Sequence, residues 1–144
     1  MSTTLQCDGI TLDIPTGWTG QVIPLDYRGR RSMIRAANFP LPSLDGFAAL
    51  PDLPPGVEDP IKGIGPGGAV LSVIPTNELL TGSRNVLKRS MVQADGLRSP
   101  RGRSIAEMRI AVAGRDIGVD VLFGSRQPTA DALAAINTML ASLR

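Results

Sequence analysis

Two stretches of alternating apolar and polar residues, separated by Gly114, constrain the fold of this chain more than any other feature. A period of two is typical of a strand with one buried face, and Gly114 lies where the chain must reverse. The sequence therefore predicts a long β-hairpin over 105–123. Its buried face is predicted to carry Ala106, Met108, Ile110 and Val112 before the glycine, and Ile117, Val119, Val121 and Phe123 after it.

The register of this hairpin is predicted from the rule that apolar residues stay opposite one another, because a slip of one residue exchanges the two faces. The predicted register pairs Val112 with Val119 and leaves Arg109 diagonal to Asp120 on the outer face. A surface ion pair contributes only about 0–1 kcal/mol. The Arg109–Asp120 relation therefore supports a register and not a catalytic site.

A second hairpin is predicted near the amino end of the sequence. Residues 10–14 alternate between aliphatic and polar side chains, and the Asp-Gly pair at 8–9 supplies a tight turn from a short strand at 5–7. Cys7 is accordingly interpreted as a strand residue. Trp18, which follows a Pro-Thr-Gly turn, is expected to pack into the core.

Three further strands are predicted over 21–25, 32–39 and 69–74. The last is nearly continuous apolar sequence, which is typical of a central strand covered on both faces. The segment 40–68 is rich in proline and glycine and predicts an irregular excursion with a short helix over 43–50. This excursion could serve as a lid over the sheet, as an interface or as a flexible loop.

The carboxyl-terminal part predicts a helix over 129–143, with Asp131 in its first turn and Asn137 beside its apolar stripe. The stripe is predicted to consist of Leu133, Ile136, Leu140 and Leu143. Together these elements predict a single α+β domain over 1–144, an antiparallel sheet with this helix on one face. The helix is expected to pack on the face that carries Ile110, Val112, Val119 and Val121.

The opening pattern Gly-Ile-x-Leu-x-Ile-Pro-x-Gly-Trp at 9–18, the segment Asn-Phe-Pro-Leu-Pro at 38–42 and the closing hairpin and helix through 144 resemble the PsbP-like fold family, in particular its small single-domain bacterial proteins. The resemblance implies an antiparallel sheet with helices on its faces and a role in binding or scaffolding. Residues 40–68 depart from the family, because the well-formed helix usually found there is missing.

Composition argues against an enzyme. The 144 residues include no histidine and a single cysteine, which removes His-paired nucleophiles and most zinc sites. The carboxylates match no metal-binding loop. We therefore predict no catalytic residue, no metal and no cofactor. The first hypothesis is a non-enzymatic protein-interaction or scaffolding module, and the alternative is a small-ligand-binding protein with an apolar or anionic pocket between residues 40–68 and the sheet.

Arginines cluster in two polar segments although the net charge is only +2. With two apolar residues of the 40–68 excursion they form the predicted interaction surface: Arg28, Arg30, Arg31, Leu44, Phe47, Arg98, Arg101 and Arg103. The arginines lack interleaved aromatic residues and a recognition helix, which argues against nucleic-acid binding. The expected partner is a protein, with a second copy of this chain among the candidates.

The first residues contain no positively charged region followed by an apolar stretch, and no segment reaches the length of a membrane span. The sequence therefore predicts a cytoplasmic protein without a membrane span and leaves export by another route open. Its single cysteine allows no internal disulfide.

Overall fold

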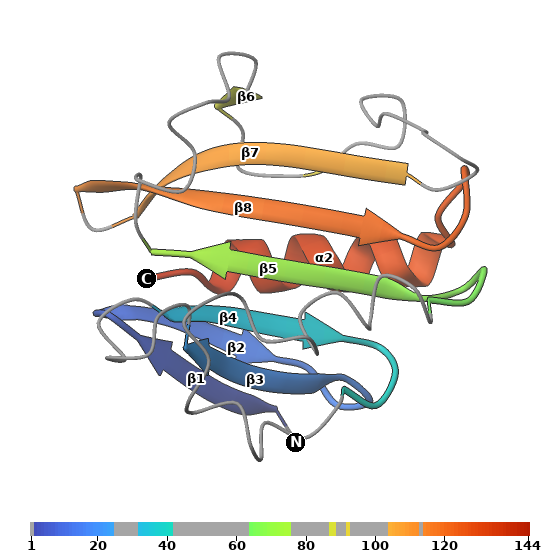
Figure 1. Cartoon of the computed structure of the whole chain (residues 1–144), viewed down its shortest axis with the longest axis horizontal. Coiled ribbons are helices and arrows are strands. Elements are labelled where there is room, and N and C mark those ends of the chain that lie inside the picture. Colours follow the sequence, from blue (N-terminus) through green and yellow to red (C-terminus); the bar gives the residue numbers. More distant parts are fainter. Residues whose placement is uncertain are drawn as a thin grey trace.

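A computed structural model describes residues 2–24, 32–41, 64–75, 87–88, 92, 104–112 and 114–144 (Figure 1). The strands in these ranges are β1 Thr3–Cys7, β2 Ile10–Ile14, β3 Thr19–Pro24, β4 Ser32–Ala37, β5 Ala69–Ile74, β6 Leu87–Lys88, β7 Ser104–Val112 and β8 Arg115–Phe123. They are followed by the helix α2, Ala130–Ser142. The helix predicted over 43–50 and the polar turn after β3 lie outside the described residues.

Six of the strands form one sheet in the order β3-β4-β5-β8-β7-β6. Neighbouring strands are antiparallel from β3 to β7, and β6 runs parallel to β7. The α+β class with an antiparallel sheet is therefore confirmed. The position of β5 is also as predicted, because it lies between β4 and β8 and all six of its residues are buried.

Strand β4 ends earlier than the predicted range 32–39, because Asn38 turns from the sheet to hold the start of β5. The side-chain Oδ1 of Asn38 accepts a hydrogen bond from the Ala69 N–H at 2.8 Å, and its Nδ2 donates to the Gly67 carbonyl at 2.9 Å. An amide side chain can do both at once, since it carries a donor and an acceptor. Asn38 thus links β4 to β5 beyond the last ladder pair.

The hairpin predicted near the amino end is confirmed as β1 and β2, with Cys7 opposite Ile10. Asp8 has φ of 50° and Gly9 has φ of 81°, the left-handed pair that a type I′ turn requires and that Asp-Gly accommodates. The hairpin forms a separate two-stranded sheet. Its residues Ile10, Leu12 and Ile14 are buried in the main core, whereas Trp18 is only partly buried against that core.

The hairpin predicted over 105–123 is confirmed as β7 and β8, but its predicted register is wrong. Val112 pairs with Arg115, not with Val119, and Val119 lies opposite Met108. Only residues 113 and 114 separate the paired strand ends, and Gly114 has φ of 78°. The turn thus lies earlier in the chain than the predicted register requires, and the shift of the pairing by four residues keeps the predicted faces.

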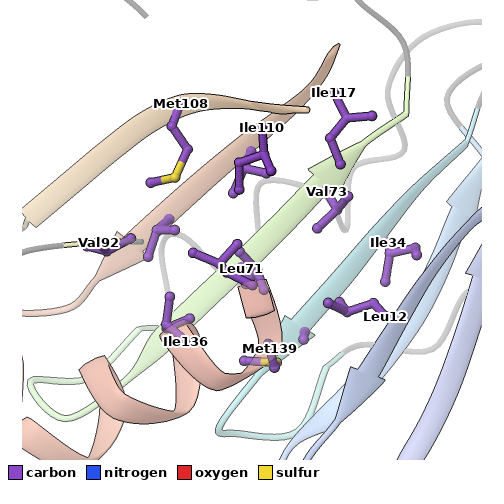
Figure 2. Close-up of a cluster of buried hydrophobic side chains, with 14 of the residues drawn as sticks. Leu12, Ile34, Leu71, Val73, Val92, Met108, Ile110, Ile117, Ile136 and Met139 are labelled. Carbon is purple, nitrogen blue, oxygen red and sulfur yellow. The ribbon is translucent and has the colours of Figure 1, made fainter. Parts of the chain in front are cut away.

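Helix α2 packs on the face of the sheet that carries Ile110, Val112, Val119 and Val121, as predicted. It runs behind β5 in Figure 1, and Figure 2 shows Ile136 and Met139 turned toward side chains of the sheet and of β2. The predicted apolar stripe of α2 is partly wrong. The buried residues of the helix are Ala132, Ile136, Met139 and Leu140, while Leu133 and Leu143 are only partly buried. The cause is that α2 packs against β2 as well as against the sheet, which rotates the buried face.

The side chain of Asn137 in α2 forms two hydrogen bonds with the backbone of Val92. Its Oδ1 accepts from the Val92 N–H at 2.7 Å and its Nδ2 donates to the Val92 carbonyl at 3.0 Å. This pair of bonds fixes the buried Val92 against the helix, so that Val92 joins the main core (Figure 2).

The residues that follow α2 are tied to β2 through backbone and side chains. Arg144 and Thr11 exchange two backbone hydrogen bonds, of 2.7 and 3.2 Å. The Arg144 guanidinium also contacts both carboxylate oxygens of Asp13, at 3.1 and 3.2 Å. The hydrogen bond from Arg144, together with one from Thr4, lowers the pKa of Asp13 below its ordinary value. The segment therefore extends the small sheet by one backbone pairing along β2.

The N-cap of α2 gives a first testable prediction. The Thr129 side-chain oxygen accepts from the Ala132 N–H at 3.1 Å and satisfies one of the donors that a helix start leaves without a partner. Thr129→Ala should lower the free energy of unfolding by about 1 kcal/mol in urea titrations. Thr138→Ala, at an exposed position of the same helix, is the control and should change stability by less than about 0.5 kcal/mol. Equal effects of the two substitutions would contradict the capping role.

Candidate functional site

The predicted interaction surface lies outside the described residues. This holds for all eight of its residues, Arg28, Arg30, Arg31, Leu44, Phe47, Arg98, Arg101 and Arg103. The described residues contain a different polar cluster, on the face of the large sheet that α2 does not cover.

That cluster arises because side chains alternate between the two faces of each strand. Ile34 and Ala36 of β4 belong to the core beneath α2, so Arg35 between them points to the opposite face. In the same way Ser72 lies between Leu71 and Val73 of β5. Each of these strands thus contributes one polar side chain to the second face of the sheet.

The sheet register aligns four polar residues into a line that crosses four strands. Arg35 pairs with Ser72, Ser72 with Asp120, and Asp120 with Glu107. We call these four residues the polar row. Positions directly opposite on antiparallel strands have Cβ atoms about 4.5–5.5 Å apart, which brings residues distant in the sequence into contact range.

An apolar row runs beside the polar row, two residues further along each strand. It consists of Ala37, Val70, Leu122 and Ile105, again connected by the register. The side with Ala37 and Val70 packs into a small buried cluster with Ile64. The second face of the sheet thus changes from apolar to polar over the distance of one strand repeat.

A pocket of about 240 Å³ lies over these two rows. Its described lining is Arg35, Val70, Ser72, Ile105, Glu107, Asp120, Val121 and Leu122. The lining includes all of the polar row and three residues of the apolar row. Inside the row, the Nε of Arg35 donates to the Oγ of Ser72 at 3.4 Å.

Two charged groups of the pocket, those of Arg35 and Asp120, lie in a poorly solvated place. Arg35 is only 5% exposed, and burial lowers the pKa of its guanidinium despite the opposing attraction of Asp120. The pKa of Asp120 is raised from 3.8 to about 6, first by burial and then by repulsion from Glu107, against the attraction of Arg35. For both groups, loss of hydration outweighs their mutual attraction.

The pKa of Asp120 predicts a specific pH dependence of stability. Because the folded chain binds this proton more tightly than the unfolded chain, the contribution is fully present below about pH 3.8 and is lost as the pH rises through about 6. Between about pH 5 and about pH 7.5 it should remove on the order of 1 kcal/mol from the free energy of unfolding. Urea titrations at both pH values should show this loss in the native chain and not in Asp120→Asn. The same pH dependence in both proteins would contradict the assignment.

The polar row was not predicted from the sequence, although the sequence carries a signal for it. Arg35, Ser72 and Asp120 each interrupt an otherwise apolar stretch that was itself predicted as a strand. A polar residue at the centre of a buried strand needs a partner on a neighbouring strand. The predicted register placed Arg109 diagonal to Asp120, and the observed register also does, but it brings Glu107 directly opposite.

The structure also bears on two other predictions, the role of Cys7 and the absence of a membrane span. Cys7 is a buried residue of β1, as predicted for a strand residue. Among the described residues, no helix has the length and apolar character needed to cross a membrane.

Comparison of the chain with protein-family models, with curated proteins and with solved structures finds no match in any of the three. The resemblance to the PsbP-like family therefore stays a prediction.

Proposed function

We propose that this protein is a non-enzymatic binding domain, and that the pocket over the polar row binds a small organic molecule. The observation that carries the proposal is the convergence of buried and partly buried charged groups in a cavity with an apolar wall. A concave apolar site with a few convergent polar groups and a perturbed pKa is the usual form of a ligand site.

Energetics support the same proposal. Placing Arg35 and Asp120 on a poorly hydrated sheet face costs free energy, since replacing buried ion pairs by well-packed apolar residues is often neutral or stabilising. The neighbouring apolar row demonstrates that these strands accommodate aliphatic side chains two residues away. Stability alone therefore gives no reason for the polar row, whereas recognition of a ligand does.

The size of the cavity indicates the scale of the ligand. Sites for drug-sized molecules occupy about 300–1,000 Å³, and this pocket is smaller, at about 240 Å³. The expected ligand is correspondingly small. Its apolar part would contact Val70, Ile105 and Leu122, and its polar group would bind to the polar row.

The non-enzymatic part of the proposal rests on the chemistry of the row. Its one hydroxyl, on Ser72, accepts from the Arg35 guanidinium, which cannot act as a general base. With no histidine in the chain, the usual base near neutral pH is missing. The protein-interaction hypothesis and a second copy as partner remain predictions, because they rest on residues outside the described part.

The proposal is tested by nuclear magnetic resonance with the isotope-labelled full chain and a library of small fragments of different charge. We expect saturable shifts of backbone amides in β4, β5 and β8 for some fragments. Leu122→Trp should abolish these shifts by filling the pocket, while Thr138→Trp, at an exposed position of α2, should leave them unchanged. The proposal is wrong if no fragment gives saturable shifts, or if the shifts persist in Leu122→Trp.

A further inference from the structure

The polar groups of the pocket differ in how far a bound molecule can reach them. Arg35 is 5% exposed and its Nε is already engaged with Ser72. Asp120 is half-buried and Glu107 is exposed. A molecule that enters from solvent therefore meets carboxylates before it meets the guanidinium.

The two carboxylates lie directly opposite each other, Asp120 on β8 and Glu107 on β7. Like charges at directly opposite positions of an antiparallel pair destabilise the sheet. The repulsion is evident at Asp120, where Glu107 is the second cause of the raised pKa after burial. A positive charge between these carboxylates would relieve the repulsion, and the adjoining wall of Leu122 and Ile105 is apolar.

We infer that the pocket selects a small organic cation, with its ammonium group between the carboxylates of Asp120 and Glu107 and its apolar body against Val70, Leu122 and Ile105. The inference rests on the proposed function and names the class of ligand. Among the described residues that line the pocket, the charged ones are Arg35, Asp120 and Glu107. Arg109 lies two residues further along β7, opposite Gly118, and is not among these described lining residues.

The inference implies that binding depends on pH. Among the described residues, the polar and charged groups that face Asp120 are Ser72 on β5, Arg35 on β4 beyond it, and Glu107 and Arg109 on β7. Since the pKa of Asp120 is about 6, it is mostly ionised at neutral pH and mostly protonated at about pH 5. A cation should therefore bind more weakly as the pH falls through 6.

Three probes carry the same cyclohexyl ring and differ in the charge of the polar group: cyclohexylmethylamine, cyclohexylmethanol and cyclohexanecarboxylate. Their affinities therefore show the effect of charge separately from that of the apolar body. Resonance titrations of the full chain at neutral pH should give an amine affinity about tenfold or more above that of the alcohol, the difference expected of one charged hydrogen bond. The carboxylate should bind more weakly than the alcohol.

Two variants test which residues hold the ammonium group. Glu107→Gln and Asp120→Asn should each weaken the amine about tenfold and change the alcohol affinity by less than about twofold. Asp8→Asn is the matched control, because it removes an exposed carboxylate in the β1–β2 turn, outside the lining of the pocket, and asparagine also tolerates positive φ. It should leave all three affinities unchanged.

The possible outcomes distinguish the inference from the function on which it rests. If the alcohol or the carboxylate binds as tightly as the amine, or if the variants leave amine binding unchanged, the pocket remains a ligand site and the cation inference is wrong. If no probe and no library fragment binds in the pocket, both are wrong. If other fragments bind and the amine does not, the cation inference alone is wrong.

Discussion

Gly124→Ala is expected to destabilise the protein by about 3 kcal/mol, a cost at the upper end of that for forcing extra volume into a packed site. A Cβ at residue 124 would overlap the carbonyl oxygen of Gly65, a backbone atom that cannot turn aside as a side chain can. The Gly124 N–H also donates to the Gly68 carbonyl at 3.0 Å. The turn before β5 and the end of β8 therefore touch backbone to backbone, and urea titration should register the loss.

Gly67→Ala is the control for this substitution. Gly67 belongs to the same turn, yet an added Cβ there would meet no heavy atom within 4 Å. Its effect should stay within about 0.5 kcal/mol. Similar losses for the two substitutions would mean that the turn tolerates no alanine for reasons other than the contact with Gly65.

Leu140→Ala is expected to cost about 2–5 kcal/mol, since it removes a side chain that is 4% exposed and leaves a cavity between α2 and the core. Leu133→Ala in the same helix makes the same chemical change at a partly buried position, and should cost about 1 kcal/mol. A loss below about 0.5 kcal/mol for Leu140→Ala would show that α2 is not docked on the sheet. The comparison measures docking separately from helix propensity, because both substitutions introduce alanine.

The elements of this fold could be predicted where a turn signal separates two periodic stretches. Asp8 and Gly9 between β1 and β2 are such a signal, and the alternation around Gly114 predicted β7 and β8. The register of the second hairpin could not be chosen in this way. A shift of the pairing by an even number of residues buries the same face, so the position of the turn decides the register, and the hydrophobic pattern does not specify that position.

The candidate site could not be predicted, because its residues come from four strands. Residues 35, 72, 107 and 120 come together only through the strand order β4-β5-β8-β7, which no local pattern specifies. What the sequence does contain is a hydrophilic residue within an otherwise apolar stretch at three of these positions, Arg35, Ser72 and Asp120. Polar interruptions in several predicted central strands are therefore worth pairing with one another before they are interpreted singly.

The pairing of β2 with the residues after α2 has a consequence for synthesis of the chain on the ribosome. An isolated two-stranded hairpin is marginally stable in water, and the aliphatic side chains of β2 are buried in a core that they share with α2 and the sheet. At about 5–20 residues per second, the hairpin emerges roughly ten seconds before Arg144 can pair with Thr11. During that interval Ile10, Leu12 and Ile14 of the nascent chain are exposed to solvent. Chaperones that bind short aliphatic segments can bind the hairpin at this stage.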